Sequence, residues 1–322
     1  MSNVLSRRVF AAGGLASAAS LATRGSIVAA DTAEKTAAGK PSGWIDAHVH
    51  VWTPDTERYP LDLKQYSVED MKPSSFTPDQ LFSQCRPSGV DRVVLIQMSF
   101  YNHDNQYMLD MIKAYPGVFS GVGIVDHQAV DLVAQMKKLA SQGVRGFRIR
   151  GRAEEVGAWQ RDPGMAKLWS AAAENDLSVC PLINPADLKM IDQLCTMYPD
   201  TRVVIDHFGR VGITGEVVPA ELDDLCRLAR HRNVHVKTSA FYALGRKKPP
   251  YKDLRPMIRR VVDAFSPQRL MWASDCPFQV QGIHDYDSSI ALIRDHMGSF
   301  SQADREWMLR GTAEKVFFNE QS

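Results

Sequence analysis

The feature that most constrains the fold of this chain is a regular alternation between short apolar segments and longer segments with helical signals. Eight apolar segments are rich in Val, Ile and Leu, as strands that are buried on both faces should be. They span residues 44–52, 91–97, 119–125, 144–150, 177–183, 202–208, 233–239 and 269–274. Capping residues, prolines or helical periodicity follow each segment, so strand and helix alternate eight times.

This alternation predicts an α/β protein whose strands close into a (β/α)8 TIM barrel. The alternative is an open, doubly wound sheet, but no glycine-rich dinucleotide-binding motif follows the first strand. A chain of 322 residues that is 44% hydrophobic can bury the core of one such barrel. Helices from about residues 286 and 302, and a short segment over residues 311–318, are expected to complete the domain.

The first part of the chain has the composition of a targeting segment. Arg7 and Arg8 precede an apolar, alanine-rich run over residues 11–22, and residues 28–30 offer a small-residue cleavage site. This pattern predicts a twin-arginine signal peptide over residues 1–30, a linker over residues 31–42 and a barrel domain over residues 43–322. The protein is then expected in the periplasm, after passage through the Tat export machinery. The apolar run is too short and too rich in Gly and Ser to favour a membrane anchor.

The net charge and the cysteine content of the chain limit the kinds of binding partner and of cross-link that can be expected. A formal net charge of +1 favours neither a nucleic-acid surface nor a polybasic membrane patch, so a small-molecule substrate is expected. The five cysteines form an odd number without C-x-x-C spacing, and each lies in or beside an apolar segment. This pattern predicts buried thiols rather than a disulfide framework.

Polar residues gather where the expected strands end. Asp46, His48 and His50 alternate with apolar residues, and a two-residue period would place all three on one face of the first strand. His207 ends the sixth strand and Asp275 ends the eighth. The carboxyl ends of barrel strands meet at one mouth, so we expect His48, His50, His207 and Asp275 to form a catalytic centre there.

A second group of residues suits substrate binding. Arg148 and Arg150 share one face of the fourth strand, and a guanidinium group is a good partner for a carboxylate. The alternative is a solvated basic loop, or a structural partner for an acid such as Asp206. Lys237 shares a face of the seventh strand with Ser239 and points either into the barrel or to a solvated rim. Further expected wall residues follow the second and seventh strands: Tyr101, His103 and Tyr242.

Four motifs, spaced along most of the chain, resemble a known family. The motifs at residues 46–50, 206–209, 273–277 and 311–313 are similar to those of the amidohydrolase-related branch of the amidohydrolase superfamily. The nearest resemblance is to its sugar-lactonase and 2-pyrone-4,6-dicarboxylate lactonase group. The resemblance implies a barrel like that of metal-dependent hydrolases, and hydrolysis of a lactone of a small carboxylated compound.

The chain departs from the metal-binding pattern of that superfamily in two places. No histidine stands at the end of the fifth strand, where residues 180–184 read Cys-Pro-Leu-Ile-Asn, and no lysine stands on the fourth strand. A two-metal site is therefore not expected. Two mechanisms stay open. Either His48, His50 and Asp275 bind one Zn²⁺, or Asp275 activates water without a metal while His48, His50 and His207 stabilise the oxyanion; the resemblance favours the second.

Two other functions remain as alternatives. A zinc-dependent decarboxylase of an aromatic or muconate-type acid would use the same rim, but normally with the missing histidine of the fifth strand. A non-catalytic periplasmic ligand-binding barrel would not need three histidines and a carboxylate at one mouth. Related sequences often have an arginine after the tyrosine of the seventh turn, whereas Ala243 follows Tyr242 here. No particular dicarboxylate specificity is therefore expected from the resemblance.

Overall fold

The computed structural model of the protein describes residues 43–319. Eight parallel strands pair in chain order to form one sheet. They are β1 (Trp44–Val49), β2 (Val90–Ile96), β3 (Phe119–Gly123), β4 (Val144–Arg150), β5 (Ser178–Leu182), β6 (Arg202–Ile205), β7 (Val234–Ser239) and β8 (Leu270–Ala273). A parallel bridge between Val49 and Cys276 joins the last strand to the first. The expected (β/α)8 barrel is therefore confirmed.

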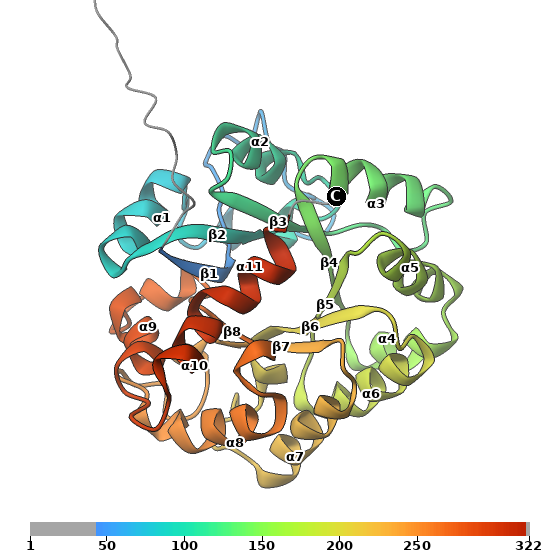
Figure 1. Ribbon diagram of the computed structural model, residues 1–322. Coiled ribbons are helices and arrows are strands. Elements are labelled where there is room, and N and C mark those ends of the chain that lie inside the picture. The colour runs from blue at the N-terminus through green and yellow to red at the C-terminus, as the bar shows by residue number, and fades with distance from the viewer. Residues whose placement is uncertain (1–42, 320–322) are drawn as a thin grey trace, which may run out of the picture. The chain divides into compact units, whose positions relative to one another are not determined.

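Helices occupy the connections between the strands and surround the barrel (Figure 1). They are α1 (Pro78–Cys85), α2 (Gln106–Ala114), α3 (Leu132–Ser141), α4 (Ala153–Ala158), α5 (Pro163–Glu174), α6 (Leu188–Met197), α7 (Pro219–Arg227), α8 (Arg255–Phe265), α9 (Tyr286–Arg294), α10 (Gln302–Glu306) and α11 (Thr312–Phe317). Alternate strand residues pack in opposite directions. Val93 and Leu95 belong to the core shared with the helices, whereas Val94 and Ile96 belong to the core inside the barrel.

Strand β1 departs from the regular two-residue period. Asp46 pairs with Val93 and Val49 pairs with Leu95, so three residue steps on β1 match two steps on β2. This extra residue is a β-bulge, which reverses the alternation of side chains beyond it. Asp46 therefore faces outward and accepts a hydrogen bond of 2.7 Å from the Tyr286 hydroxyl on α9. The expectation that Asp46, His48 and His50 share one face is wrong.

Several strands are shorter than the sequence suggests, because the backbone turns sharply at their carboxyl ends. The sixth strand ends at Ile205, and His207 and Phe208 then adopt φ values of 53° and 55°. Asp275, beyond β8, has a φ of 66°. Left-handed backbone is costly for residues with a Cβ and is concentrated at functional sites. His207 and Asp275 therefore lie in strained turns beyond their strands, whereas His48 lies within β1.

The C-terminal helix α11 closes the amino-terminal end of the barrel. Ala313, Val316 and Phe317 pack with Ile45 and Val94 in the interior core. Figure 1 shows α11 lying across the strands at this end. The opposite end, where the strands terminate, is left for chemistry.

Two sequence predictions outside the barrel have different outcomes. All five cysteines are buried and unpaired, which confirms the prediction of buried thiols. The expected signal peptide and linker, residues 1–42, lie outside the described residues. Within residues 43–319, no helix combines the length and apolar character that a bilayer-spanning segment needs.

Candidate active site

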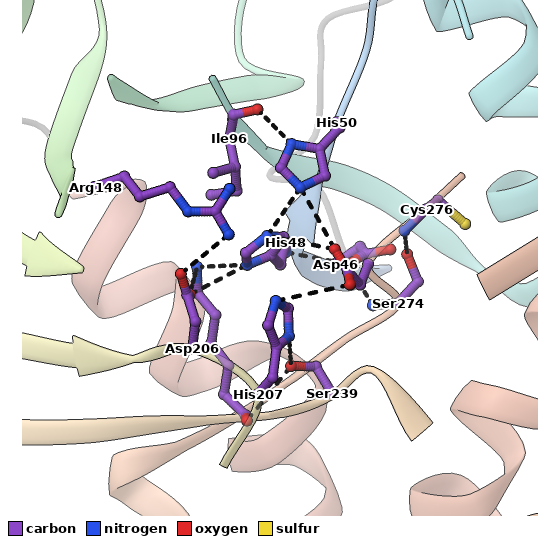
Figure 2. Close-up of polar contacts among 12 residues, drawn as sticks. Asp46, His48, His50, Ile96, Arg148, Asp206, His207, Ser239, Ser274 and Cys276 are labelled. Atoms are coloured by element: carbon purple, nitrogen blue, oxygen red, sulfur yellow. Dashed lines mark hydrogen bonds and ion pairs between the residues drawn. The ribbon is translucent and has the colours of Figure 1, made fainter. Parts of the chain in front are cut away.

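The four residues expected at the mouth come together at the ends of β1, β6 and β8. Figure 2 shows the three histidines of this group, His48, His50 and His207, facing one another. The Nε2 atoms of His48 and His50 lie 3.3 Å apart. Asp275 Oδ1 lies 3.5 Å from His48 Nε2 and 3.4 Å from His50 Nε2. His207 Nε2 lies 3.7 Å from the other carboxylate oxygen of Asp275. All four side chains are buried.

Neighbouring groups fix the orientation of these side chains. His50 Nδ1 lies 2.8 Å from the carbonyl oxygen of Ile96, to which only a protonated nitrogen can donate. His207 Nδ1 and Ser239 Oγ form a hydrogen bond of 2.8 Å. The Tyr242 hydroxyl donates to Asp275 Oδ2 over 2.7 Å. Tyr242 was expected as a wall residue, and it also holds the carboxylate that faces the histidines.

A buried charge network lies directly behind His48. Asp206 is fully buried, and its Oδ1 lies 3.0 Å from Lys237 Nζ and 3.2 Å from His48 Nδ1. Its other oxygen lies 3.5 Å from Arg148 Nη2. Asp206 was not among the residues expected in the catalytic centre, and the direction of Lys237 could not be predicted from its position alone. Lys237 and Ser239 are two positions apart and therefore lie on the same face of β7. This spacing was the signal in the sequence that the Lys237 side chain points into the barrel.

Burial and charge set the ionisation of these groups. Burial alone would raise the pKa of Asp206, but Lys237, His48 and Arg148 together hold it well below its usual value. Burial likewise opposes ionisation of Asp275, yet His207, His50 and His48 lower its pKa. Burial lowers the pKa of both His48 and His207. At neutral pH the site therefore combines the ionised carboxylates of Asp206 and Asp275 with neutral imidazoles at His48 and His207.

A cavity of about 290 Å³ opens above this centre. Its lining includes His50, Arg148, His207, Tyr242 and Asp275. His48 is fully buried beneath these residues and is not part of the lining. The expectation that His48 contacts the reacting carbonyl is therefore corrected, because its imidazole reaches Asp275 but not the cavity.

A second cavity of about 730 Å³ adjoins the first, and Arg148, Leu182 and Arg210 line both. Arg150 and His103 line only the second cavity. The side chain of Arg148 is 4% exposed, and its Nε has no hydrogen-bond partner among the described residues. Arg148 thus forms an ion pair with Asp206, which was the structural alternative to substrate binding. Its side chain also lines both cavities.

Tyr101 does not take the position that its sequence suggested. Its side chain is 3% exposed and packs against the rings of Phe100 and Tyr107. Among the described residues, it is not in the lining of either cavity. The prediction of Tyr101 as a wall residue is wrong, because the turn after β2 directs this ring into the core.

The donor atoms around Asp275 have the spacing of a metal site. Ligands about 2.0–2.1 Å from a tetrahedral zinc ion lie about 3.3 Å from one another. The three spacings among His48 Nε2, His50 Nε2 and Asp275 Oδ1 are 3.3, 3.4 and 3.5 Å. A wider set replaces His50 by His207, with ligand atoms within 4.8 Å of one another. The narrower set, which the sequence predicted, fits one divalent ion better.

A barrel with histidines and an aspartate gathered at its strand ends has the architecture of a barrel enzyme. Residues 45–318 match the model of the amidohydrolase family, and the chain therefore belongs to this family. The L-fucono-1,5-lactonase of Burkholderia ambifaria is 30% identical over 252 residues, 77% of this chain and 85% of the relative. The 2-pyrone-4,6-dicarboxylate hydrolase of Comamonas testosteroni is 30% identical over 246 residues, 74% of this chain and 77% of the relative.

Solved structures share the barrel at lower sequence identity. An amidohydrolase of Burkholderia multivorans, solved with bound zinc, has a TM-score of 0.73 and 21% identity. This match covers 87% of the present chain and all of the solved one. At this identity the likeness supports the fold alone. Family membership makes the protein an enzyme of the hydrolase class, and the non-catalytic binding barrel is set aside.

Proposed function

We propose that the protein hydrolyses the ring ester of a small lactone that carries an anionic group. The observation that supports this most directly is the carboxylate of Asp275, which borders the 290 Å³ cavity and is kept ionised by its neighbours. An ionised carboxylate beside neutral histidines is suited to take a proton from water. The two relatives described above are themselves a lactonase and a pyrone dicarboxylate hydrolase.

In the proposed reaction Asp275 takes a proton from a water molecule while the water oxygen bonds to the lactone carbonyl carbon. His207 lines the cavity, and in the tautomer with its hydrogen on Nε2 this N–H stabilises the carbonyl oxygen as that oxygen becomes negative. The ring C–O bond then breaks, and Asp275 returns its proton to the departing oxygen. The product is a hydroxy acid, which ionises at neutral pH and releases one proton.

The arginines at the mouth are the reason for proposing a substrate with an anionic group. Arg148 lines both cavities, and its guanidinium group is a suitable partner for a carboxylate. Arg150 extends this basic surface into the second cavity, which His103 also lines. We infer that the lactone ring occupies the smaller cavity and that its anionic substituent points towards the larger one. Ala243 lines the smaller cavity and carries no charge, so the arginines are the residues that we propose bind the anionic substituent.

The donor set also fits a single divalent ion. His48, His50 and Asp275 would hold it, and the ion would supply Lewis-acid activation of water or of the carbonyl. The metal-free pathway above uses only groups of this chain.

A panel of carboxylated lactones, assayed with a pH indicator, tests the proposal. Hydrolysis releases a proton, whereas decarboxylation consumes one, so the direction of the pH change separates the two reactions. We expect wild-type protein to acidify the medium, and Asp275→Asn to lose about 10²–10⁴-fold in rate. Asp263→Asn, at an exposed surface position, is the matched control. Unchanged rates in Asp275→Asn would remove the hydrolase mechanism.

We also propose that the enzyme acts after export to the periplasm. The support is the Arg7–Arg8 pair before an apolar run, which is typical of twin-arginine signals. The double variant Arg7→Lys and Arg8→Lys should leave the full-length chain in the cytoplasm, as measured by cell fractionation. Recovery of this variant from the periplasm at the wild-type level would contradict the proposal.

A further inference from the structure

Lys237 has a position that the proposed reaction does not use. Its side chain is fully buried, and Nζ lies 3.0 Å from Asp206 Oδ1 and 3.1 Å from His48 Nδ1. His48 Nδ1 and Asp206 Oδ1 are themselves 3.2 Å apart. The three atoms thus form a nearly equilateral triangle behind the imidazole, on the side away from the cavity. An ammonium group has three hydrogens to donate and no lone pair to accept.

The hydrogens in this triangle can be arranged in two ways, because a neutral imidazole has a single N–H. In the first, Lys237 donates to both Asp206 Oδ1 and His48 Nδ1, and the imidazole hydrogen is on Nε2. In the second, His48 Nδ1 donates to Asp206, and its hydrogen then faces the ammonium hydrogens across 3.1 Å. The first arrangement gives Lys237 two acceptors but gives up the hydrogen bond from His48 to Asp206, whereas the second keeps that bond, leaves Lys237 one acceptor and adds a donor–donor contact.

The opposite side of the His48 ring favours the same arrangement. His48 Nε2 faces two acceptors there. His50 Nε2 has a lone pair because His50 Nδ1 donates to Ile96, and Asp275 Oδ1 is a carboxylate oxygen. If His48 Nε2 carried no hydrogen, it would be a third acceptor. Three acceptors spaced 3.3–3.5 Å apart repel one another unless a proton or a cation lies between them. A hydrogen on His48 Nε2 removes this repulsion.

We propose that Lys237 is a positioning residue that holds His48 as the Nε2–H tautomer. In this form His48 donates towards Asp275 and His50 and steadies the carboxylate that takes the proton from water. The same hydrogen blocks the lone pair with which His48 would bind a divalent ion. The hydrogen bond from Lys237 and metal binding through His48 therefore exclude each other, so Lys237 sets the affinity of the centre for metal. This inference concerns the hydrogen bonds of the site and does not depend on the substrate.

Imidazole ¹⁵N NMR of wild-type protein tests the tautomer without any change to Lys237. Two-bond ¹⁵N–¹H correlations distinguish the Nδ1–H and Nε2–H forms, and the His48 signals are assigned by their loss in His48→Asn. We expect the Nε2–H pattern in protein prepared with a chelator. An Nδ1–H pattern for His48 in this sample would overturn the proposal, whatever the substrate of the enzyme is.

Zinc titration of Lys237→Met tests the link to metal binding. This variant removes the donor to His48 Nδ1, so we expect at least a tenfold rise in zinc affinity, measured by competition with a chelating dye. Arg148→Met is the matched control, because it also removes a buried cation beside Asp206, but one that lies against the oxygen of Asp206 that does not face His48. Equal zinc affinities in wild type and Lys237→Met, or an equal rise in Arg148→Met, would overturn the proposal.

Discussion

At the scale of single residues, the active site depends on matched buried charges. Asp206 and Asp275 are both enclosed by protein, where an isolated carboxylate would be costly. Lys237 and Arg148 balance the first, and the hydroxyl of Tyr242 and the histidines stabilise the second. The negative charge on Asp275 is therefore a property of its neighbours, and it is available for proton transfer at neutral pH.

His235, which pairs with Val204 of β6 and shares the inward face of β7 with Lys237, makes the stability of the fold depend on pH. Burial lowers its pKa to about 4, below the ordinary value of about 6.5 for an unfolded chain. Between these two pKa values the imidazole of His235 is protonated in the unfolded state but not in the folded state, so the free energy of unfolding decreases as the pH decreases. Linkage predicts a loss of about 2 kcal/mol between pH 7 and pH 5.

Urea denaturation of wild type and His235→Gln at both pH values measures this term. The variant has no proton to bind at this position, so its unfolding free energy should decrease less on acidification, by about the same 2 kcal/mol. An identical pH dependence in the two proteins would mean that His235 is not responsible.

At the scale of elements, the bulge in β1 decides where the histidines point. Ile45 and Ala47 face the interior core, and the extra residue then allows His48 and His50 to face inward as well. Asp46 stabilises this irregular backbone. Its Oδ1 accepts hydrogen bonds from the amides of His48 at 3.2 Å and Ser274 at 2.9 Å, and thus ties β1 to the end of β8.

Substitutions of Asp46 should show whether the fold is stabilised by the hydrogen bonds that this side chain accepts or by its charge. Burial raises the pKa of Asp46 to about 6, so the charge adds little stability, whereas three donors depend on its oxygens. We expect Asp46→Asn to change the unfolding free energy by less than about 1 kcal/mol, and Asp46→Ala to lower it by about 3 kcal/mol. Kinetics of both variants should show reduced kcat/KM in Asp46→Ala, because His48 and Asp275 lose their common support. Equal stability of the two variants would refute this role.

The strands and helices could be predicted from the sequence more accurately than the directions of the side chains within them. Strand order, closure and the meeting of His207 with Asp275 follow from apolar periodicity and the rule that strand ends share one mouth. The bulge could not be predicted, because a strict two-residue alternation in residues 46–50 looks the same with or without an inserted residue. The direction of Tyr101 and the triangle at Lys237 depend on turn geometry and on partners more than 100 positions away along the chain.

At the scale of the whole molecule, the barrel has one open end and one closed end. The mouth has two connected cavities lined by arginines, and the other end is filled by α11. The two ends are connected through Lys237, whose Nζ lies 5.7 Å from the centre of the Phe317 ring on α11. The C-terminal helix therefore completes the apolar core beneath the charge network as well as the barrel itself.

Phe317 should be a main contributor to this closure. Its side chain is 1% exposed inside the barrel core, so Phe317→Ala is expected to lower the unfolding free energy by about 3–5 kcal/mol through lost burial and an unfilled cavity. Phe318 is the matched control, since the neighbouring ring is half-buried and contacts the guanidinium of Arg92 at 5.0 Å. We expect Phe318→Ala to cost about 1–2 kcal/mol. Urea denaturation compares the two variants, and a cost in Phe317→Ala no larger than in Phe318→Ala would mean that α11 packs against the barrel without stabilising it.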